Sequence, residues 1–217
     1  MSEFLLAEDV ALLLLNDTSG WMRGQFADIA LAGAVLTDLA IRGRVRLTEK
    51  GERDVRPKRV VIVDDSATDD PILDAALARL AGRPARWQQT SLQVLRTQVK
   101  PAVLQRLVER GILEQREVRL LGLLPLKTYP TLDHSHEDGL RRRLFAVLVQ
   151  GEQPTVRDAC LVALLEAMNL AAKTVAEDVS TVDKRAIHRR AKEFRQQHWA
   201  AEAAYRLIQS QQSAAVG

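Results

Sequence analysis

Few residues in this chain have types and spacings that could bind a metal ion. His134 and His136 stand one residue apart beside Asp133, which together offer two imidazoles and a carboxylate. No third ligand pattern accompanies them, whereas zinc sites draw three or four ligands from characteristic spacings. We therefore predict that these side chains face solvent and that the chain binds no metal ion or other cofactor.

Recognisable catalytic motifs are missing from the sequence. It has no Gly-rich phosphate loop and no nucleophile elbow. Asp64, Asp65, Asp69 and Asp70 lack the glycine and terminal glutamate of a calcium loop. The single cysteine, Cys160, lies in an apolar stretch, which predicts a buried, unreactive thiol and excludes an intrachain disulfide bond. The chain is therefore expected to be a binding protein and not an enzyme.

The most unusual segment spans residues 118–130. Leucine occupies five of the seven positions from 120 to 126, namely Leu120, Leu121, Leu123, Leu124 and Leu126. Gly122 and Pro125 disfavour a helix, so the segment is predicted to form a β-hairpin. Strand side chains alternate between two faces, so a protruding hairpin cannot hide every leucine. Its exposed face needs a membrane edge or a protein partner; the alternative is a strand pair buried within the domain.

Basic residues lie close to this leucine-rich hairpin. Arg116, Arg119 and Lys127 flank the apolar run, and Tyr129 follows it. An arginine or lysine near an anionic bilayer contributes roughly 1 kcal/mol, and an inserted leucine contributes about as much. Stable anchoring needs two such signals, so the combination predicts reversible binding to anionic membranes. No apolar run approaches the length of about 18 residues that crosses a bilayer, and contact should be peripheral.

Hydrophobic periodicity predicts that helices position the hairpin. The predicted helices cover residues 4–16, 25–42, 71–81, 91–110, 140–149, 156–179 and 182–209. Asp69 or Asp70 is the candidate N-cap of the third helix. Ser91 is the candidate N-cap of the fourth, which Pro101 limits or kinks. The helix at 156–179 is apolar nearly all round, and we predict it to be the central buried helix.

A helix, a terminating glycine and an alternating segment occur twice. Gly43 and Gly111 end the second and fourth helices. Short strands are predicted at 44–49 and 58–64. The repeat is either a common structural device used twice or a winged-helix module. The nucleic-acid-binding alternative rests on the basic residues of the first ribbon, which are Arg42, Arg44, Arg46, Arg53, Arg56, Lys58 and Arg59.

Composition indicates a globular protein in a reducing compartment. A chain of 217 residues can bury a full core in one domain. The net charge of +3 requires no polyanionic partner, and 4% aromatic residues are few for stacking on single-stranded RNA. The acidic N-terminus lacks the basic start of a signal peptide. Arginine outnumbers lysine by 24 to 7, a usage that we interpret as bacterial.

Several segments together resemble a known family. They are the leucine helix at 4–16, Leu-Ala-Ile-Arg-Gly-Arg at 39–44, Leu-Val-Glu-Arg-Gly at 107–111, the leucine-rich hairpin, and the helix that contains Arg142-Arg143-Leu144. In this order they are similar to the Golgi phosphoprotein 3 family, in the form found in bacteria. The similarity runs from Phe4 to Ile208.

The resemblance implies a mainly α fold: a single helical domain, 1–217, around a central buried helix, with short β-ribbons and one protruding hydrophobic β-hairpin. Residues 209–217 are expected to be a disordered tail. It also implies binding of phosphatidylinositol 4-phosphate in a basic pocket, whose residues fall on Trp21, Arg23, Arg96 and Lys100. Arg96 and Lys100 are i,i+4 neighbours and share one helix face. The pocket arginine of the family's second helix falls on Ala32, a departure that leaves the headgroup open.

These observations favour a non-catalytic peripheral membrane protein at the cytoplasmic membrane face, with no nucleic-acid partner. Two alternatives remain. One is the winged-helix nucleic-acid-binding protein, which the leucines of the second ribbon do not suit. The other is a scaffold in which the hairpin forms the clasp of a homodimer.

Overall fold

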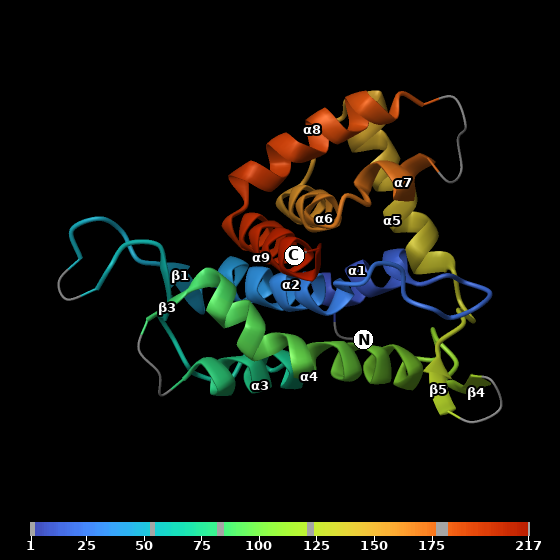
Figure 1. The fold of residues 1–217 in the computed structure, drawn as a ribbon, viewed down its shortest axis with the longest axis horizontal. Coiled ribbons are helices and arrows are strands. Elements are labelled where there is room, and N and C mark those ends of the chain that lie inside the picture. Colours follow the sequence, from blue (N-terminus) through green and yellow to red (C-terminus); the bar gives the residue numbers. More distant parts are fainter. Residues whose placement is uncertain (1–2, 53–54, 82–84, 121–123, 177–181, 217) are drawn as a thin grey trace.

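The fold is a stack of helices with two small antiparallel sheets (Figure 1). A computed structural model describes residues 3–52, 55–81, 85–120, 124–176 and 182–216. The helices are α1 (Leu6–Leu14), α2 (Ala27–Ile41), α3 (Pro71–Leu80), α4 (Gln88–Glu109), α5 (Ser135–Phe145), α6 (Val156–Ala167), α7 (Ala171–Ala176), α8 (Lys184–Gln197) and α9 (Trp199–Val216), with a π-helical turn at Ala146–Gln150. The strands are β1 (Val45–Leu47), β2 (Arg59–Ile62), β3 (Arg86–Trp87), β4 (Arg116–Leu120) and β5 (Leu124–Thr128). The predicted mainly α architecture with short ribbons is confirmed.

Helix α2 is the central helix of the molecule. It lies between a layer that contains α3 and α4 and a layer that contains α6 and α9 (Figure 1). Its residues from 29 to 39 are all buried, and α1 beside it is buried along its whole length. The helix predicted to be central and buried, 156–179, is buried from Asp158 to Ala167 in α6, as predicted, and α2 is a second buried helix that lies between the two layers. Both sequences are apolar all round, so their periodicity could not rank them.

Close packing around α2 depends on Gly33. A Cβ atom at this position would lie 3.1 Å from Leu164 Cδ2 on α6 and 3.6 Å from Ala204 Cβ on α9. A larger side chain would therefore push two helices away from α2. The glycine lets three helices approach one another at one point of the core.

Helices α3 and α4 pack against each other on one side of α2. The Asp70 carboxylate accepts hydrogen bonds from the N–H groups of Ile72 and Leu73, which makes it the N-cap of α3. The prediction that Ser91 caps α4 is wrong, because α4 begins at Gln88 and Ser91 is buried inside it. Helix α4 continues through Pro101 and is visibly bent (Figure 1), as expected for a helix that contains proline.

The C-terminal half has more breaks than its sequence predicts. The helix predicted at 156–179 is divided into α6 and α7, because Asn169 takes a left-handed conformation with φ of 57°. The helix predicted at 182–209 is divided at His198, whose backbone is extended. Helix α9 then continues to Val216, where a disordered tail was predicted. Neither break lies at a proline or a glycine. The apolar spacing continues across both positions, and for this reason it predicted two uninterrupted helices.

Both predicted ribbons are present. Strands β1, β2 and β3 form one antiparallel sheet, and β4 and β5 form the other. Gly43 follows α2 with φ of 70° and Gly111 follows α4 with φ of 71°. This left-handed conformation favours glycine, which explains why both helices end where they do. The helix, glycine and ribbon pattern is thus used twice.

Helix α1 carries two buried carboxylates that connect it to three other elements. Glu8 is 0% exposed and its Oε1 lies 3.2 Å from Arg110 Nε, just after α4. Asp9 is 1% exposed and lies 2.7 Å from both His136 Nε2 on α5 and Arg157 Nη2 on α6. The prediction that His136 faces solvent is therefore wrong. Buried ionic contacts of this kind fix the position of the first helix.

Two other buried carboxyl groups should make the stability depend on pH. Burial raises the pKa of Asp38 to about 7, against the opposing effect of Arg157, and burial raises the pKa of Glu166 to about 7, against that of Arg195. In the unfolded chain these groups ionise near pH 4. Between about pH 4 and about pH 7 the folded state therefore holds more protons than the unfolded state. Both groups consequently lower the free energy of unfolding as the pH rises through this window.

We expect the Asp38→Asn variant to lose part of this pH dependence. An amide oxygen can still accept the hydrogen bond that Leu6 N–H donates to the carboxylate, but the amide does not ionise. Relative to the native chain, the variant should therefore gain stability steadily from about pH 5 to about pH 7. Urea unfolding across this range measures the difference. Parallel stability curves for the two proteins would contradict the assignment.

Candidate functional site

The predicted leucine-rich hairpin is formed by β4 and β5 and stands near the end of α4 (Figure 1). The register pairs Val118 with Leu126 and Glu117 with Lys127. Residues paired across two strands share a face, so one face carries an apolar pair and the other a charged pair. Val118 is 39% exposed, which leaves part of the apolar face of the hairpin open to solvent.

The tip of the hairpin is only partly described. Leu121 and Leu123 lie outside the described residues, and the structure gives the backbone but not the side chains of Leu120 and Leu124. Leu126 is half-buried. Within the described ranges, no helix is long and apolar enough to cross a membrane.

The turn at residues 16–21, between α1 and α2, holds the base of the hairpin. The carbonyl of Gly20 accepts a hydrogen bond from Tyr129 N–H at 3.0 Å, and the carbonyl of Asp17 accepts one from Thr131 N–H at 3.1 Å. A Cβ atom on Gly20 would lie 2.3 Å from Tyr129 N. Only glycine allows the two backbones to approach this closely, and its φ of 66° also favours glycine.

A cavity of about 350 Å³ lies between this turn, α4 and the hairpin. It is lined by Leu15, Gly20, Trp21, Met22, Lys100, Pro101, Leu104, Lys127 and Tyr129. Trp21 is 46% exposed, so much of its indole remains available to a bound molecule. We call this space the hairpin cavity. It combines apolar walls with two ammonium groups.

Lys100 from α4 and Lys127 from β5 give the hairpin cavity its positive charge. Across the described part of the chain, neither ammonium group forms an ion pair with a carboxylate, although Glu117 lies opposite Lys127 in the strand register. Burial raises the pKa of Tyr129, so its phenol stays protonated and can donate a hydrogen bond. Unpaired cations beside a hydrogen-bond donor are the groups that bind phosphate. The hairpin cavity is therefore suited to an anion with an apolar attachment.

Of the four pocket residues expected from the family resemblance, Trp21 and Lys100 meet at the hairpin cavity. Arg96 lies one turn before Lys100 on α4, and its Nε donates to Asp28 Oδ2 at 2.6 Å. Arg96 and Arg23 are not among the lining residues that the structure describes. Arg96 and Lys100 lie one turn apart on α4, as their i,i+4 spacing predicts, but the Asp28 carboxylate already pairs with Arg96.

Two lining residues, Lys127 and Tyr129, were not assigned to the pocket from the sequence. They are two residues apart at the end of β5, a spacing that places side chains on one face of a strand. The sequence feature that could have assigned them to the pocket is their position directly after the leucine run. Ala32, onto which the family resemblance placed a pocket arginine, is 0% exposed within α2. The positive charge of this cavity comes instead from α4, through Lys100, and from β5, through Lys127.

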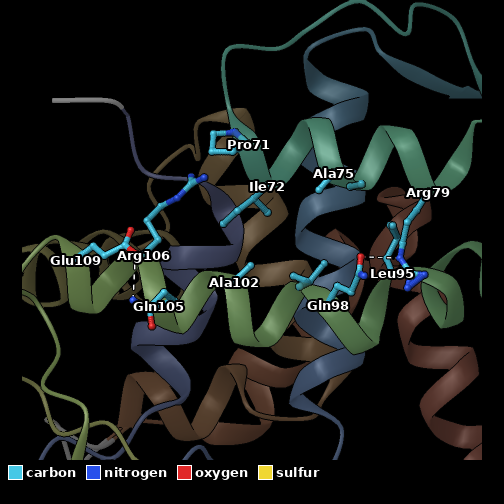
Figure 2. A pocket seen from close by; sticks show the side chains of 12 residues that line it. Pro71, Ile72, Ala75, Arg79, Leu95, Gln98, Ala102, Gln105, Arg106 and Glu109 are labelled. Carbon is cyan, nitrogen blue, oxygen red and sulfur yellow. Dashed lines mark hydrogen bonds between the residues drawn. The ribbon is translucent and has the colours of Figure 1, made fainter.

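A second cavity, of about 290 Å³, lies between α3 and α4 (Figure 2). Its walls are mainly aliphatic, and its two arginines already have partners. Arg106 forms a bidentate ion pair with Asp70 at 2.7 and 2.9 Å, and Arg79 Nε donates to Gln98 Oε1 at 2.6 Å. A bound anion would have to displace these contacts. This cavity is therefore less suited to a charged headgroup than the hairpin cavity.

The first ribbon offers a weaker basic surface than its sequence suggested. Arg44 forms an ion pair with Asp64, and Arg46 forms one with Glu52 at 2.7 Å. Arg53 lies outside the described residues. Each paired guanidinium has less charge to offer to a phosphate backbone. These pairs count against the nucleic-acid-binding alternative.

Cys160 on α6 is buried, as predicted. It is 3% exposed, and its Sγ lies 3.4 Å from His198 Nδ1. Burial raises the pKa of the thiol to about 11, with a further contribution from Asp38. The thiolate that would be needed for nucleophilic chemistry is therefore scarce at neutral pH.

Comparison with known proteins identifies the family of this chain. Residues 6–211 match the family model described as Golgi phosphoprotein 3 (GPP34). The chain is 28% identical over 162 residues to vacuolar protein sorting-associated protein 74 of Eremothecium gossypii, in an alignment that covers 66% of this chain and 49% of that protein. It is 27% identical over 165 residues to the protein of the same name in Schizosaccharomyces pombe, with 66% and 48% covered. The chain thus spans about half the length of these curated relatives. Because the family model matches nearly the whole sequence, the chain belongs to the Golgi phosphoprotein 3 family.

Proposed function

We propose that this chain is a peripheral membrane protein that binds anionic phospholipid headgroups, with phosphatidylinositol 4-phosphate as the first candidate. The observation that carries the proposal is the hairpin cavity, where Lys100, Lys127 and Trp21 meet at the base of an apolar hairpin. A phosphorylated headgroup supplies the anionic partner that the two lysines lack. Binding at the cytoplasmic face of a membrane would require neither catalysis nor a cofactor. The two relatives are named after protein sorting, a process that takes place on membranes.

The distance between the cavity and the hairpin tip suits a bilayer. Lys127 lies three residues from Leu124, which corresponds to about 10 Å of strand. The headgroup layer on each side of a bilayer is about 5–8 Å thick. Leucines at the tip could therefore enter the hydrocarbon while the hairpin cavity stays at the level of the phosphates.

The expected affinity is that of reversible docking. Roughly four inserted leucines at about 1 kcal/mol each provide around 4 kcal/mol, which is below stable anchoring. Lys100, Lys127 and Arg119 add roughly 1 kcal/mol apiece near an anionic surface, and Arg116 adds less because it already pairs with Glu114 at 2.5 Å. Neither contribution suffices alone, so membrane binding should require anionic lipid.

Vesicle flotation tests the proposal. We expect the protein to float with phosphatidylcholine vesicles that contain phosphatidylserine or phosphatidylinositol 4-phosphate, and to stay behind with phosphatidylcholine alone. At matched total charge, the phosphoinositide vesicles should retain the protein at higher salt, since a cavity contact is screened less than a surface contact. Equal flotation on neutral and anionic vesicles, or none on either, would overturn the proposal.

The hairpin's own role is tested by replacing both Leu123 and Leu124 with aspartate. The double variant should leave the anionic vesicles while its circular dichroism spectrum stays unchanged, because these residues belong to the predicted inserting tip. Light scattering on the same variant distinguishes the alternative of a homodimer clasp. A halved molar mass with vesicle binding intact would favour the clasp.

A further inference from the structure

Three side chains with metal-binding chemistry meet beside the turn at residues 16–21. Asp17 belongs to that turn, His134 directly precedes α5, and Glu137 lies in the first turn of α5. One donor atom from each lies within 4.8 Å of the other two. The distance between His134 Nδ1 and Asp17 Oδ2 is 3.7 Å.

Two of the three side chains carry a buried oxygen atom without a partner. Glu137 is 1% exposed, and its Oε1 accepts hydrogen bonds from Arg141 at 2.6 and 2.9 Å. Its Oε2 is buried and, among the described residues, has no hydrogen-bond donor. The same is true of Asp17 Oδ1. Buried carboxylate oxygens that lack a donor call for a group that would satisfy them, and two such oxygens belong to side chains of one cluster.

We propose that Asp17, His134 and Glu137 bind a divalent transition-metal ion, with zinc as the best fit. Zinc accepts imidazole nitrogen and carboxylate oxygen at about 2.0–2.2 Å, which places neighbouring ligand atoms about 3.3 Å apart in a tetrahedron. The 3.7 Å between His134 Nδ1 and Asp17 Oδ2 needs only a small closure. Their side chains are 46% and 42% exposed, so water can complete the coordination. Magnesium and calcium prefer sites made of oxygen alone.

The charges that face the site favour a cation. Two carboxylates meet one imidazole there, and Arg141 donates two hydrogen bonds to Oε1 of Glu137. The neighbouring carboxylate of Asp133 accepts a hydrogen bond from Ser135 N–H and adds negative charge nearby. The positive end of α5 opposes a cation, but this effect is weaker than direct coordination.

The ion would join segments that are distant in the sequence. Asp17 lies in the turn that carries Trp21, and its carbonyl accepts a hydrogen bond from Thr131 N–H just after the hairpin. A metal bound to Asp17 and to the start of α5 would therefore brace the base of the hairpin. This consequence for lipid binding depends on the proposed function, whereas metal binding itself does not.

The test titrates zinc alone into untagged protein that has been treated with EDTA and desalted. Competition with a chromophoric chelator should show one zinc ion per chain, with a dissociation constant in the micromolar range or below. Zinc should raise the melting temperature by several degrees, and the same concentration of magnesium should not. The Asp17→Asn and His134→Gln variants should each weaken zinc binding at least about tenfold. Both residues are partly exposed, so these variants should fold, which circular dichroism checks.

Two matched variants control for non-specific binding. Asp133→Asn removes a nearby charge but no proposed ligand, and His188→Gln removes a second exposed histidine that lies 2.7 Å from a carboxylate, Glu166. His188→Gln should bind zinc as the native chain does, and Asp133→Asn should weaken zinc binding by no more than a few-fold, because it removes a nearby charge and no ligand. Absence of stoichiometric zinc binding, or unchanged affinity in Asp17→Asn or His134→Gln, would overturn the proposal. Zinc binding without vesicle binding would support the metal site and count against the lipid function alone.

Discussion

Reversing the charges of Lys100 and Lys127 together is expected to abolish binding to anionic vesicles. Both ammonium groups line the hairpin cavity, and neither pairs with a carboxylate in the described structure. A lysine near an anionic surface contributes roughly 1 kcal/mol, so its reversal to glutamate costs roughly 2 kcal/mol. The Lys100→Glu/Lys127→Glu variant should therefore partition on the order of 1,000-fold more weakly in a vesicle titration.

A matched variant separates this effect from the change in net charge. Lys50 and Lys184 are both exposed and do not line the hairpin cavity. Lys50→Glu/Lys184→Glu changes the net charge by the same amount and should bind vesicles within a few-fold of the native chain. If both double variants lose binding equally, the whole surface and not the cavity is responsible.

Replacing Arg157 by methionine should strongly destabilise the fold. The guanidinium lies 2.7 Å from Asp9 Oδ2 and 3.9 Å from Asp38 Oδ1, and both carboxylates are nearly inaccessible. Removing one partner of a buried ion pair costs about 3–5 kcal/mol, and Asp9 would keep only its contact with His136 Nε2 at 2.7 Å. We expect a loss near the lower end, about 3 kcal/mol, because Arg157 is itself 28% exposed. Urea unfolding at neutral pH measures it.

A second substitution tests whether the lost ion pair is the cause. Adding Asp9→Asn to Arg157→Met removes one of the two stranded carboxylates and should recover part of the lost stability. Arg185→Met on the exposed side of α8 should stay within about 0.5 kcal/mol of the native chain. An Arg157→Met protein as stable as the Arg185→Met protein would show that this ionic contact does not stabilise the fold.

Local features of this protein could be predicted from the sequence because they depend on near neighbours. The stripe of apolar residues predicts α1 and α2, and the left-handed glycines after α2 and α4 mark where helices end. The hairpin at β4 and β5 follows from Gly122, Pro125 and the leucines around them. In each case the residues that determine the structure lie within one or two turns of one another.

The division of the long helices could not be predicted in the same way. Asn169 and His198 interrupt helices without proline or glycine, and the apolar spacing continues across both positions. The cost of a local break is small beside the burial gained when α6, α7, α8 and α9 pack on one another and on α2. Tertiary packing therefore decided the breaks.

Only part of the site could be predicted from the sequence. The hairpin can be identified from residue types and spacing, and the family resemblance implies Trp21 and Lys100, but only folding joins them with Lys127 and Tyr129 in one cavity. Folding also pairs Arg96 with Asp28, 68 positions away. Sequence spacing alone thus determined the helices, their glycine ends and the leucine-rich hairpin. Tertiary structure decided which cations remain unpaired, because an ion pair depends on distance in space and the chain brings its partners together from far apart.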